Sequence, residues 1–92
     1  MPEDGNVSDT LAAILTRRGR AVEALPYALY AAARSPENAE FHERLGDTLR
    51  DAGRMDDAVA AWRRALELTQ SDDPRRRLNE RLSAAPAAAP GK

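Results

Sequence analysis

The sequence has 92 residues, of which 42% are hydrophobic and 32% charged, with a formal net charge of -1. This length fits one small domain, and the absence of cysteine excludes disulfides, thiolate chemistry and the usual cysteine-ligated zinc sites. The near-neutral charge argues against a nucleic-acid binder that depends on a strongly basic surface. Because aromatic residues make up only 4% while alanine is abundant, the composition favours closely packed helices over a β core.

The first seven residues, 1–7, are predicted to be a flexible lead, with Asp4-Gly5 as a turn signal. The start of the chain is acidic and lacks the apolar segment of a signal peptide. No apolar run approaches the roughly 20 residues that span a bilayer. We therefore expect a cytoplasmic protein without membrane association.

A pair of helices is predicted in the first third of the chain. Ser8 is the expected N-cap of a helix that carries arginines in its last turn and is ended by Gly19. A second helix is expected over about 21–34. Pro26 lacks a backbone donor, so it should kink this second helix or move its start towards Pro26.

The same arrangement of two helices follows in the middle of the chain. Ser35 is the expected N-cap of the third helix, with Pro36 in its first position, and the helix should run to about Arg50. Gly53 ends it, and a fourth helix is expected from Met55 to Leu68. The apolar positions at helical spacing in these two helices are Phe41, Leu45, Leu49, Val59, Trp62 and Leu66.

A fifth, short helix is predicted over about 74–82, with Asp73 as its N-cap and Pro74 in its first position. Leu78 and Leu82 form its only apolar stripe, and its arginine-rich remainder suits a solvent-facing cap. The last residues, 84–92, consist mainly of alanine and proline without a pattern and are predicted to be disordered.

The chain repeats itself with a period of 34 residues. Gly53 follows Gly19 at this offset, and the same offset relates Leu11 to Leu45 and Ala24 to Ala58. A fixed period of this size indicates stacked supersecondary units, each of which buries its apolar face only against a neighbour. Gly46 and Ala58 are small where two helices should nearly touch, and Trp62 should fill the space between layers.

The second unit, "NAEFHERLGDTLRDAGRMDDAVAAWRRALEL", resembles the tetratricopeptide repeat family. His42 stands where that family usually has tryptophan, and Gln70 where it usually has proline. The resemblance implies an all-α, short solenoid of two helix-turn-helix repeats with a capping helix. The predicted domain covers 8–83, with repeat one over about 8–34, repeat two over about 36–69 and the capping helix over about 74–82.

In this family the first helix of each unit lines a concave groove that often holds peptides. The resemblance therefore implies a partner-binding groove that needs no cofactor or metal. Glu40, Glu43 and Asp47 would form an acidic stripe in it, because they are spaced i, i+3 and i+7. Two interpretations stay open: the stripe binds a basic or hydrogen-bonding peptide, or Arg75, Arg76 and Arg77 partly neutralise it. The predicted groove residues are Ala13, Thr16, Arg17, Glu40, Glu43, Asp47, Arg50 and Asp51.

The predicted function is protein–protein interaction, by a small adaptor or accessory subunit that binds a partner protein or peptide. The alternative is a structural module that assembles with itself, as a homo-oligomer formed by stacking of repeats. Nucleic-acid association through the C-terminal arginines is a weaker third reading and is not expected. No catalytic motif is present, and packing is a better explanation of His42, the only histidine, than catalysis. Tyr27 and Tyr30 could belong either to the core or to an apolar surface patch.

Overall fold

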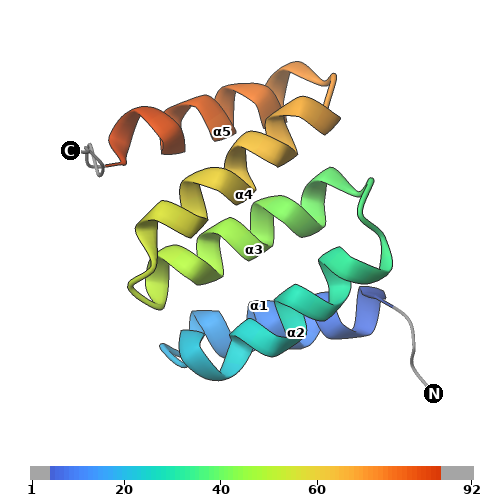
Figure 1. Ribbon diagram of the computed structural model, residues 1–92, viewed down its shortest axis with the longest axis vertical. Coiled ribbons are helices and arrows are strands. Elements are labelled where there is room, and N and C mark those ends of the chain that lie inside the picture. Colours follow the sequence, from blue (N-terminus) through green and yellow to red (C-terminus); the bar gives the residue numbers. More distant parts are fainter. Residues whose placement is uncertain (1–4, 86–92) are drawn as a thin grey trace.

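The computed structural model describes residues 5–85, and over this range the chain forms helices without any strand. Successive helices run antiparallel and stack along the long axis of the molecule, so the first and the last described helix lie at opposite ends of the stack (Figure 1). The all-α fold is therefore confirmed. The helices are α1 (Gly5–Arg17), α2 (Ala21–Arg34), α3 (Ala39–Asp51), α4 (Met55–Leu68) and α5 (Asp72–Ala84).

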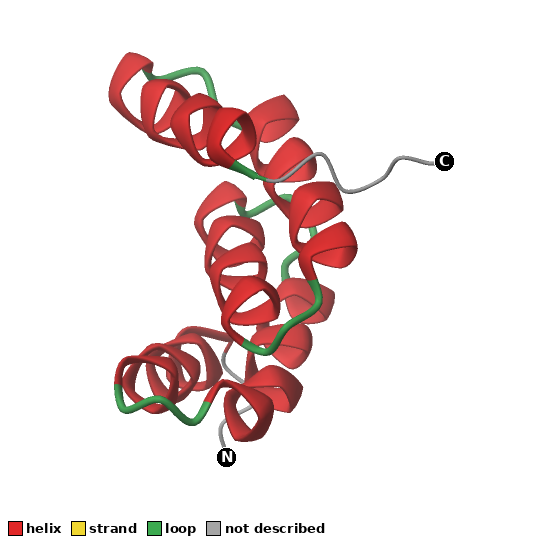
Figure 2. Cartoon of the chain, turned by 90° about the vertical axis from the view of Figure 1, so that its left-hand side faces the viewer, coloured by secondary structure: helices red, strands yellow, loops and turns green. Residues whose placement is uncertain are grey.

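Two helical hairpins and one further helix make up the stack. α1 packs against α2, α3 packs against α4, and the second hairpin rests on the first through contacts of α3 with both α1 and α2. α5 covers the far end by packing on α4. Seen along the helix axes, the stack curves into a shallow arc, with α1, α3 and α5 on its inner side (Figure 2).

Alanine and a few large side chains form the core between the helices. Trp62, Leu78 and Thr48 are the largest fully buried side chains among the described residues. Small side chains let the helices approach closely, as the alanine-rich composition predicts. The buried alanines are Ala12, Ala21, Ala24, Ala28, Ala31, Ala32, Ala58, Ala61 and Ala65.

Gly46 is the point of closest approach between α3 and α4. A Cβ atom built on Gly46 would overlap the indole ring of Trp62, which is 1% exposed. The predicted need for a small residue here is confirmed, because only glycine leaves room for the indole.

Glycine also sets the turn inside each hairpin. Gly19 and Gly53 have φ angles of 78° and 84°, a region that side chains with a Cβ rarely adopt. In the second hairpin the Arg54 N–H donates to the Leu49 carbonyl at 2.8 Å and the Gly53 N–H donates to the Arg50 carbonyl at 3.0 Å. These two bonds define a Schellman C-cap, and bonds at 2.9 and 3.0 Å repeat the arrangement around Gly19.

Two predicted helix starts, those of α1 and α3, differ from the structure. α1 already begins at Gly5, so Ser8 lies inside the helix rather than at its N-cap, and residues 5–7 are helical rather than flexible. Pro36 does not open α3. Instead, Ser35-Pro36-Glu37-Asn38 forms a turn closed by the Asn38 N–H on the Ser35 carbonyl at 2.9 Å, because proline suits the second position of such a turn. Asn38 is the N-cap, and its side-chain oxygen accepts from the Phe41 N–H at 3.2 Å.

Two further predictions concerned proline and the last helix. α2 runs from Ala21 through Pro26, so the helix does not start later as one of the two expectations held. α5 begins at Asp72 with Ser71 as the N-cap, and Pro74 lies in its first turn, where the missing N–H costs nothing. α5 also extends to Ala84, into the segment predicted to be disordered. The remaining terminal predictions, for residues 1–4 and 86–92, lie outside the described residues.

Candidate partner-binding groove

The inner side of the arc carries two adjoining hollows. The first, of about 390 Å³, lies between α3 and α5, and the second, of about 280 Å³, lies between α1 and α3. Arg44 and Asp47 line both, so the two hollows are neighbours along α3, and we refer to them together as the groove. The first hollow is lined by Glu40, Glu43, Arg44, Asp47, Arg77 and Arg81, and the second by Ala13, Thr16, Arg17, Arg44, Asp47, Thr48, Arg50 and Asp51.

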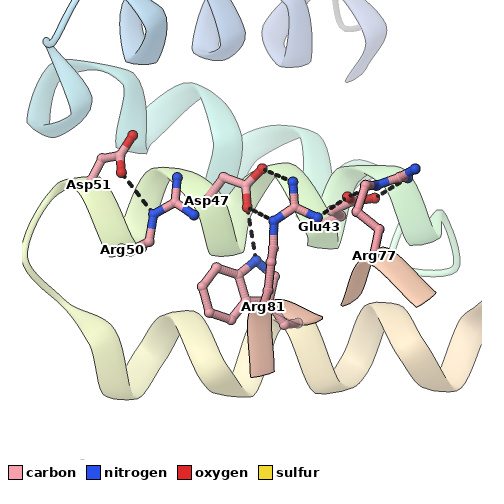
Figure 3. Close-up of polar contacts among 7 residues, drawn as sticks. Glu43, Asp47, Arg50, Asp51, Arg77 and Arg81 are labelled. Carbon is pink, nitrogen blue, oxygen red and sulfur yellow. Dashed lines mark hydrogen bonds and ion pairs between the residues drawn. The ribbon is translucent and has the colours of Figure 1, made fainter. Parts of the chain in front are cut away.

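Glu43 is held by two arginines that reach across from α5 (Figure 3). The Arg77 Nε donates to Glu43 Oε2 at 2.6 Å and its Nη2 donates to Oε1 at 2.9 Å, which is a bidentate pair. The Arg81 Nη1 donates to the same Oε2 at 2.6 Å. The Glu43 side chain is only 12% exposed, but Arg77 is 47% exposed and Arg81 24%, so the Arg81 contact is the better shielded of the two.

Asp47 lies one turn further along α3 and shares Arg81 with Glu43 (Figure 3). The Arg81 Nε approaches Asp47 Oδ1 at 2.9 Å, and its Nη2 donates to Oδ2 at 3.2 Å. The buried indole of Trp62 donates its N–H to Asp47 Oδ1 at 3.0 Å. Asp47 thus links the core tryptophan to the capping helix.

The two carboxylates respond differently to this environment. Burial acts to raise the pKa of Glu43, but the hydrogen bonds and positive charges of Arg77 and Arg81 outweigh it, so the pKa is lowered. Burial raises the pKa of Asp47, and the charge of Arg81 with the Trp62 hydrogen bond offsets it only in part. For Asp47 burial remains the larger effect, although Arg81 and Arg50 act against it, whereas for Glu43 two hydrogen-bonded guanidinium groups outweigh burial.

The second hollow has a hydroxyl pair on its floor. The Thr16 and Thr48 hydroxyl oxygens lie 3.0 Å apart, and Thr48 is fully buried. On the wall, Arg50 stacks over Trp62, with 5.8 Å between the guanidinium carbon and the ring centre, and pairs with Asp51 at 2.9 Å. Arg17 contributes an exposed cationic side chain at the rim.

A second bidentate pair joins α1 to α3. Arg44 donates from Nε and Nη2 to the two carboxylate oxygens of Asp9, at 2.9 and 3.1 Å. Hydrogen bonding to Asp9 raises the pKa of Arg44. Arginine–carboxylate pairs therefore connect α1 to α3 and α3 to α5 along the floor of the groove.

Each of the eight predicted groove residues lines one of the two hollows, and their role in partner binding stays a prediction. The predicted set lacked Arg44, Thr48 and Arg81, which also line the hollows. The repeat period contained a signal for Arg81, because Asp47 and Arg81 are 34 positions apart, as are Glu43 and Arg77. Equivalent positions of successive units lie side by side in a stack, so these pairs follow from the period.

The neutralisation of the acidic stripe was only partly anticipated. Arg77 pairs with Glu43 as expected, but Arg75 and Arg76 do not reach the stripe. Arg75 donates to the carbonyls of Leu66 and Thr69 at 3.1 and 3.2 Å and so caps the C-terminal end of α4. Arg76 pairs with Asp73 at 3.2 Å, one turn back on its own helix.

His42 has a local structural contact outside the groove. Its Nε2 lies 2.9 Å from the Pro36 carbonyl, which can only accept, so Nε2 carries the proton. The ring thereby fastens the turn before α3 to the first turn of that helix. Among residues 5–85, no group of three or more histidine, cysteine, aspartate or glutamate side chains is arranged to hold a metal ion.

Stacked antiparallel hairpins with a polar groove along their first helices define a helical-repeat protein. Residues 39–72, which comprise α3, α4 and the link to α5, match the family model described as tetratricopeptide repeat. The chain therefore carries a tetratricopeptide repeat, and the resemblance is confirmed. A comparison with curated proteins found no match. Tetratricopeptide repeats generally mediate protein–protein interaction and are typically non-catalytic. No helix among residues 5–85 has the length and apolar character to cross a membrane.

Proposed function

We propose that this chain is a small adaptor or accessory subunit that binds a partner protein or peptide in the groove along α3. The observation that supports the proposal is that two hollows adjoin along α3: they share Arg44 and Asp47, and each of the eight expected residues lines one or the other. We further propose that it acts in the cytoplasm and without catalysis.

The charges of the groove define the kind of partner. The first hollow has three acidic and three basic side chains, and the ion pairs with Arg77 and Arg81 leave no free acidic stripe. Glu40 and Arg17 remain exposed at the two ends, without a hydrogen bond or ion pair to any described residue. A peptide that forms hydrogen bonds and carries charges of both signs suits this surface better than a uniformly basic one.

The ion pairs at the base of the groove also favour binding, because they hold the surrounding side chains in place before a partner binds. Asp9–Arg44 and Glu43–Arg77 are both bidentate, and each joins two helices. A groove whose side chains are already ordered loses less conformational entropy on binding.

The test compares proteins captured by the wild-type chain from its native cells with those captured by the double variant Glu40→Lys, Arg17→Glu. This variant keeps the net charge and leaves the ion pairs of the floor intact. The control is Asp56→Lys, Arg63→Glu, which makes the same exchange at exposed positions of α4 that line neither hollow.

The proposal predicts a specific partner that wild type and control retain and the groove variant loses. With that partner purified, titration calorimetry should show at least about a tenfold weaker Kd for the groove variant, as expected for loss of two rim charges. Equal retention and equal Kd for all three proteins would refute binding in this groove.

A further inference from the structure

The exposed apolar surface of the molecule is concentrated on one hairpin. Seven large apolar side chains are between 39% and 71% exposed among residues 5–85, and every one of them belongs to α1 or α2. The second hairpin and α5 contribute none to this group. We call this set the N-terminal apolar face: Val7, Leu11, Ile14, Val22, Tyr27, Leu29 and Tyr30.

On α1 the apolar face lies on the side of the helix that corresponds to the covered side of α3. Residues spaced i, i+4 and i+7 lie on one side of a helix, and Val7, Leu11 and Ile14 have this spacing. The residues 34 positions later on α3 are 4%, 8% and 0% exposed, because the first hairpin covers them. Nothing in residues 5–85 covers α1 in the same way. The covered equivalents are Phe41, Leu45 and Thr48.

On α2 the apolar face also includes positions that no neighbouring hairpin would cover. Val22 and Leu29 are 71% and 49% exposed. The residues 34 positions later, Asp56 and Arg63, are charged and face solvent on α4. Solvent-facing positions that are charged in one hairpin are thus apolar in the other, and exposed apolar patches of this extent mark interaction surfaces.

No segment among residues 5–85 covers this face, because α5, the one described helix outside the two hairpins, packs on α4 at the opposite end of the molecule.

We propose that the N-terminal apolar face binds the same face of a second copy and forms a two-fold symmetric dimer. A large side chain offers about 150–250 Å², so the seven expose roughly 600–700 Å² per copy. A contact that covers all seven side chains on both copies would bury at most roughly 1,300 Å², at the lower end of the range of about 1,200–2,000 Å² of specific interfaces. The dimer concerns a different surface from the groove and is independent of the proposed function.

The polar surface at the opposite end of the molecule favours a two-fold contact over head-to-tail stacking. The outer side of α5 is polar, with Asp72, Arg75 and Glu80 among the residues that line its shallow hollow. Head-to-tail stacking would place the apolar face against these charges. Apolar surface is buried on both copies only if the N-terminal apolar face of one copy contacts the same face of the other. Such an isologous contact gives a closed dimer to which no third copy can add.

Sedimentation velocity of the full chain over about 1–500 µM tests the proposal. Wild type should shift from 10.0 kDa towards twice that mass and no further. The variant Val22→Asp, Leu29→Arg installs the residues that the second hairpin has at these positions, and should weaken the dimer at least about a hundredfold. The control Asp56→Asn, Arg63→Gln on α4 should dimerise like wild type.

If circular dichroism shows that the apolar-face variant Val22→Asp, Leu29→Arg is unfolded, chemical cross-linking of single-cysteine variants tests the dimer instead. Because the chain has no cysteine, a single Leu29→Cys should give covalent dimers with a bis-maleimide, while Glu80→Cys should not. A monomer at all concentrations, assemblies beyond two copies, or a folded apolar-face variant that still dimerises would each overturn the proposal. The groove variant Glu40→Lys, Arg17→Glu should leave the dimer unchanged, so the two proposals fail separately.

Discussion

Replacement of Arg81 by methionine tests how firmly the capping helix is tied to α3. Arg81 approaches two carboxylates at 2.6, 2.9 and 3.2 Å, and its side chain is 24% exposed. Charge-assisted hydrogen bonds contribute about 1.5–3 kcal/mol each when fully shielded. Because solvent screens part of this cluster and Glu43 keeps Arg77, we expect a loss of about 1–2 kcal/mol. For comparison, the free energy of unfolding of the whole chain should be about 5–14 kcal/mol.

Urea unfolding followed by circular dichroism measures this loss, and Arg76→Met provides the matched control. It makes the same substitution on the same helix, but the Arg76–Asp73 pair is 68% and 85% exposed. Exposed pairs contribute about 0–1 kcal/mol, so the control should lie within about 0.5 kcal/mol of wild type. If both variants lose the same stability, the buried network does not hold α5 in place.

The pH dependence of the Arg81→Met variant provides an independent check. The lowered pKa of Glu43 means that its stabilising contribution is present above its unfolded-state pKa and is lost as pH falls through its folded-state value. The raised pKa of Asp47 acts in the opposite sense, since its ionisation opposes folding as pH rises. Without Arg81 the pKa of Asp47 should rise further, so the deficit of the variant should be largest near neutral pH and shrink in acid.

Three other substitutions test the packing. Gly46→Ala should lower the free energy of unfolding by about 1–3 kcal/mol, because the added methyl overlaps Trp62; an unchanged melting temperature would contradict this close approach. Leu78→Ala should cost about 2–4 kcal/mol and increase hydrogen exchange in α5 more than in α3, since Leu78 is 1% exposed; uniform exchange would argue against its anchoring role. Thr48→Val should cost about 1 kcal/mol, and adding Thr16→Val should recover part of it; strictly additive losses would show that the hydroxyl pair is not coupled.

The period of 34 residues predicted most of the fold. Gly19 and Gly53 mark the turn of each hairpin, and the apolar spacing located the helices between them. Helix starts were less predictable, because a Ser-Pro pair suits both an N-cap and the turn that Asn38 closes before α3. The early start of α1 at Gly5 had no sequence signal, since Asp4-Gly5 is typical of a turn.

For the groove, the positions of the residues were predictable, but which carboxylates are paired with arginines was not. Spacing alone placed Glu40, Glu43 and Asp47 on one face, and the structure confirms that they share a hollow. Whether that face is acidic depends on which arginines of the next helix reach it, and this is decided by the register of α5. Arg77 and Arg81 reach the carboxylates and Arg76 does not, although all three lie within two turns.

Amide hydrogen exchange of the full chain, with and without its purified partner, tests the central proposal most directly. Binding in the groove predicts slower exchange on the inner side of the arc, in residues 13–17, 40–51 and 77–81. Protection confined to α2 and α4 on the outer side, with unchanged exchange in these three segments, would contradict it.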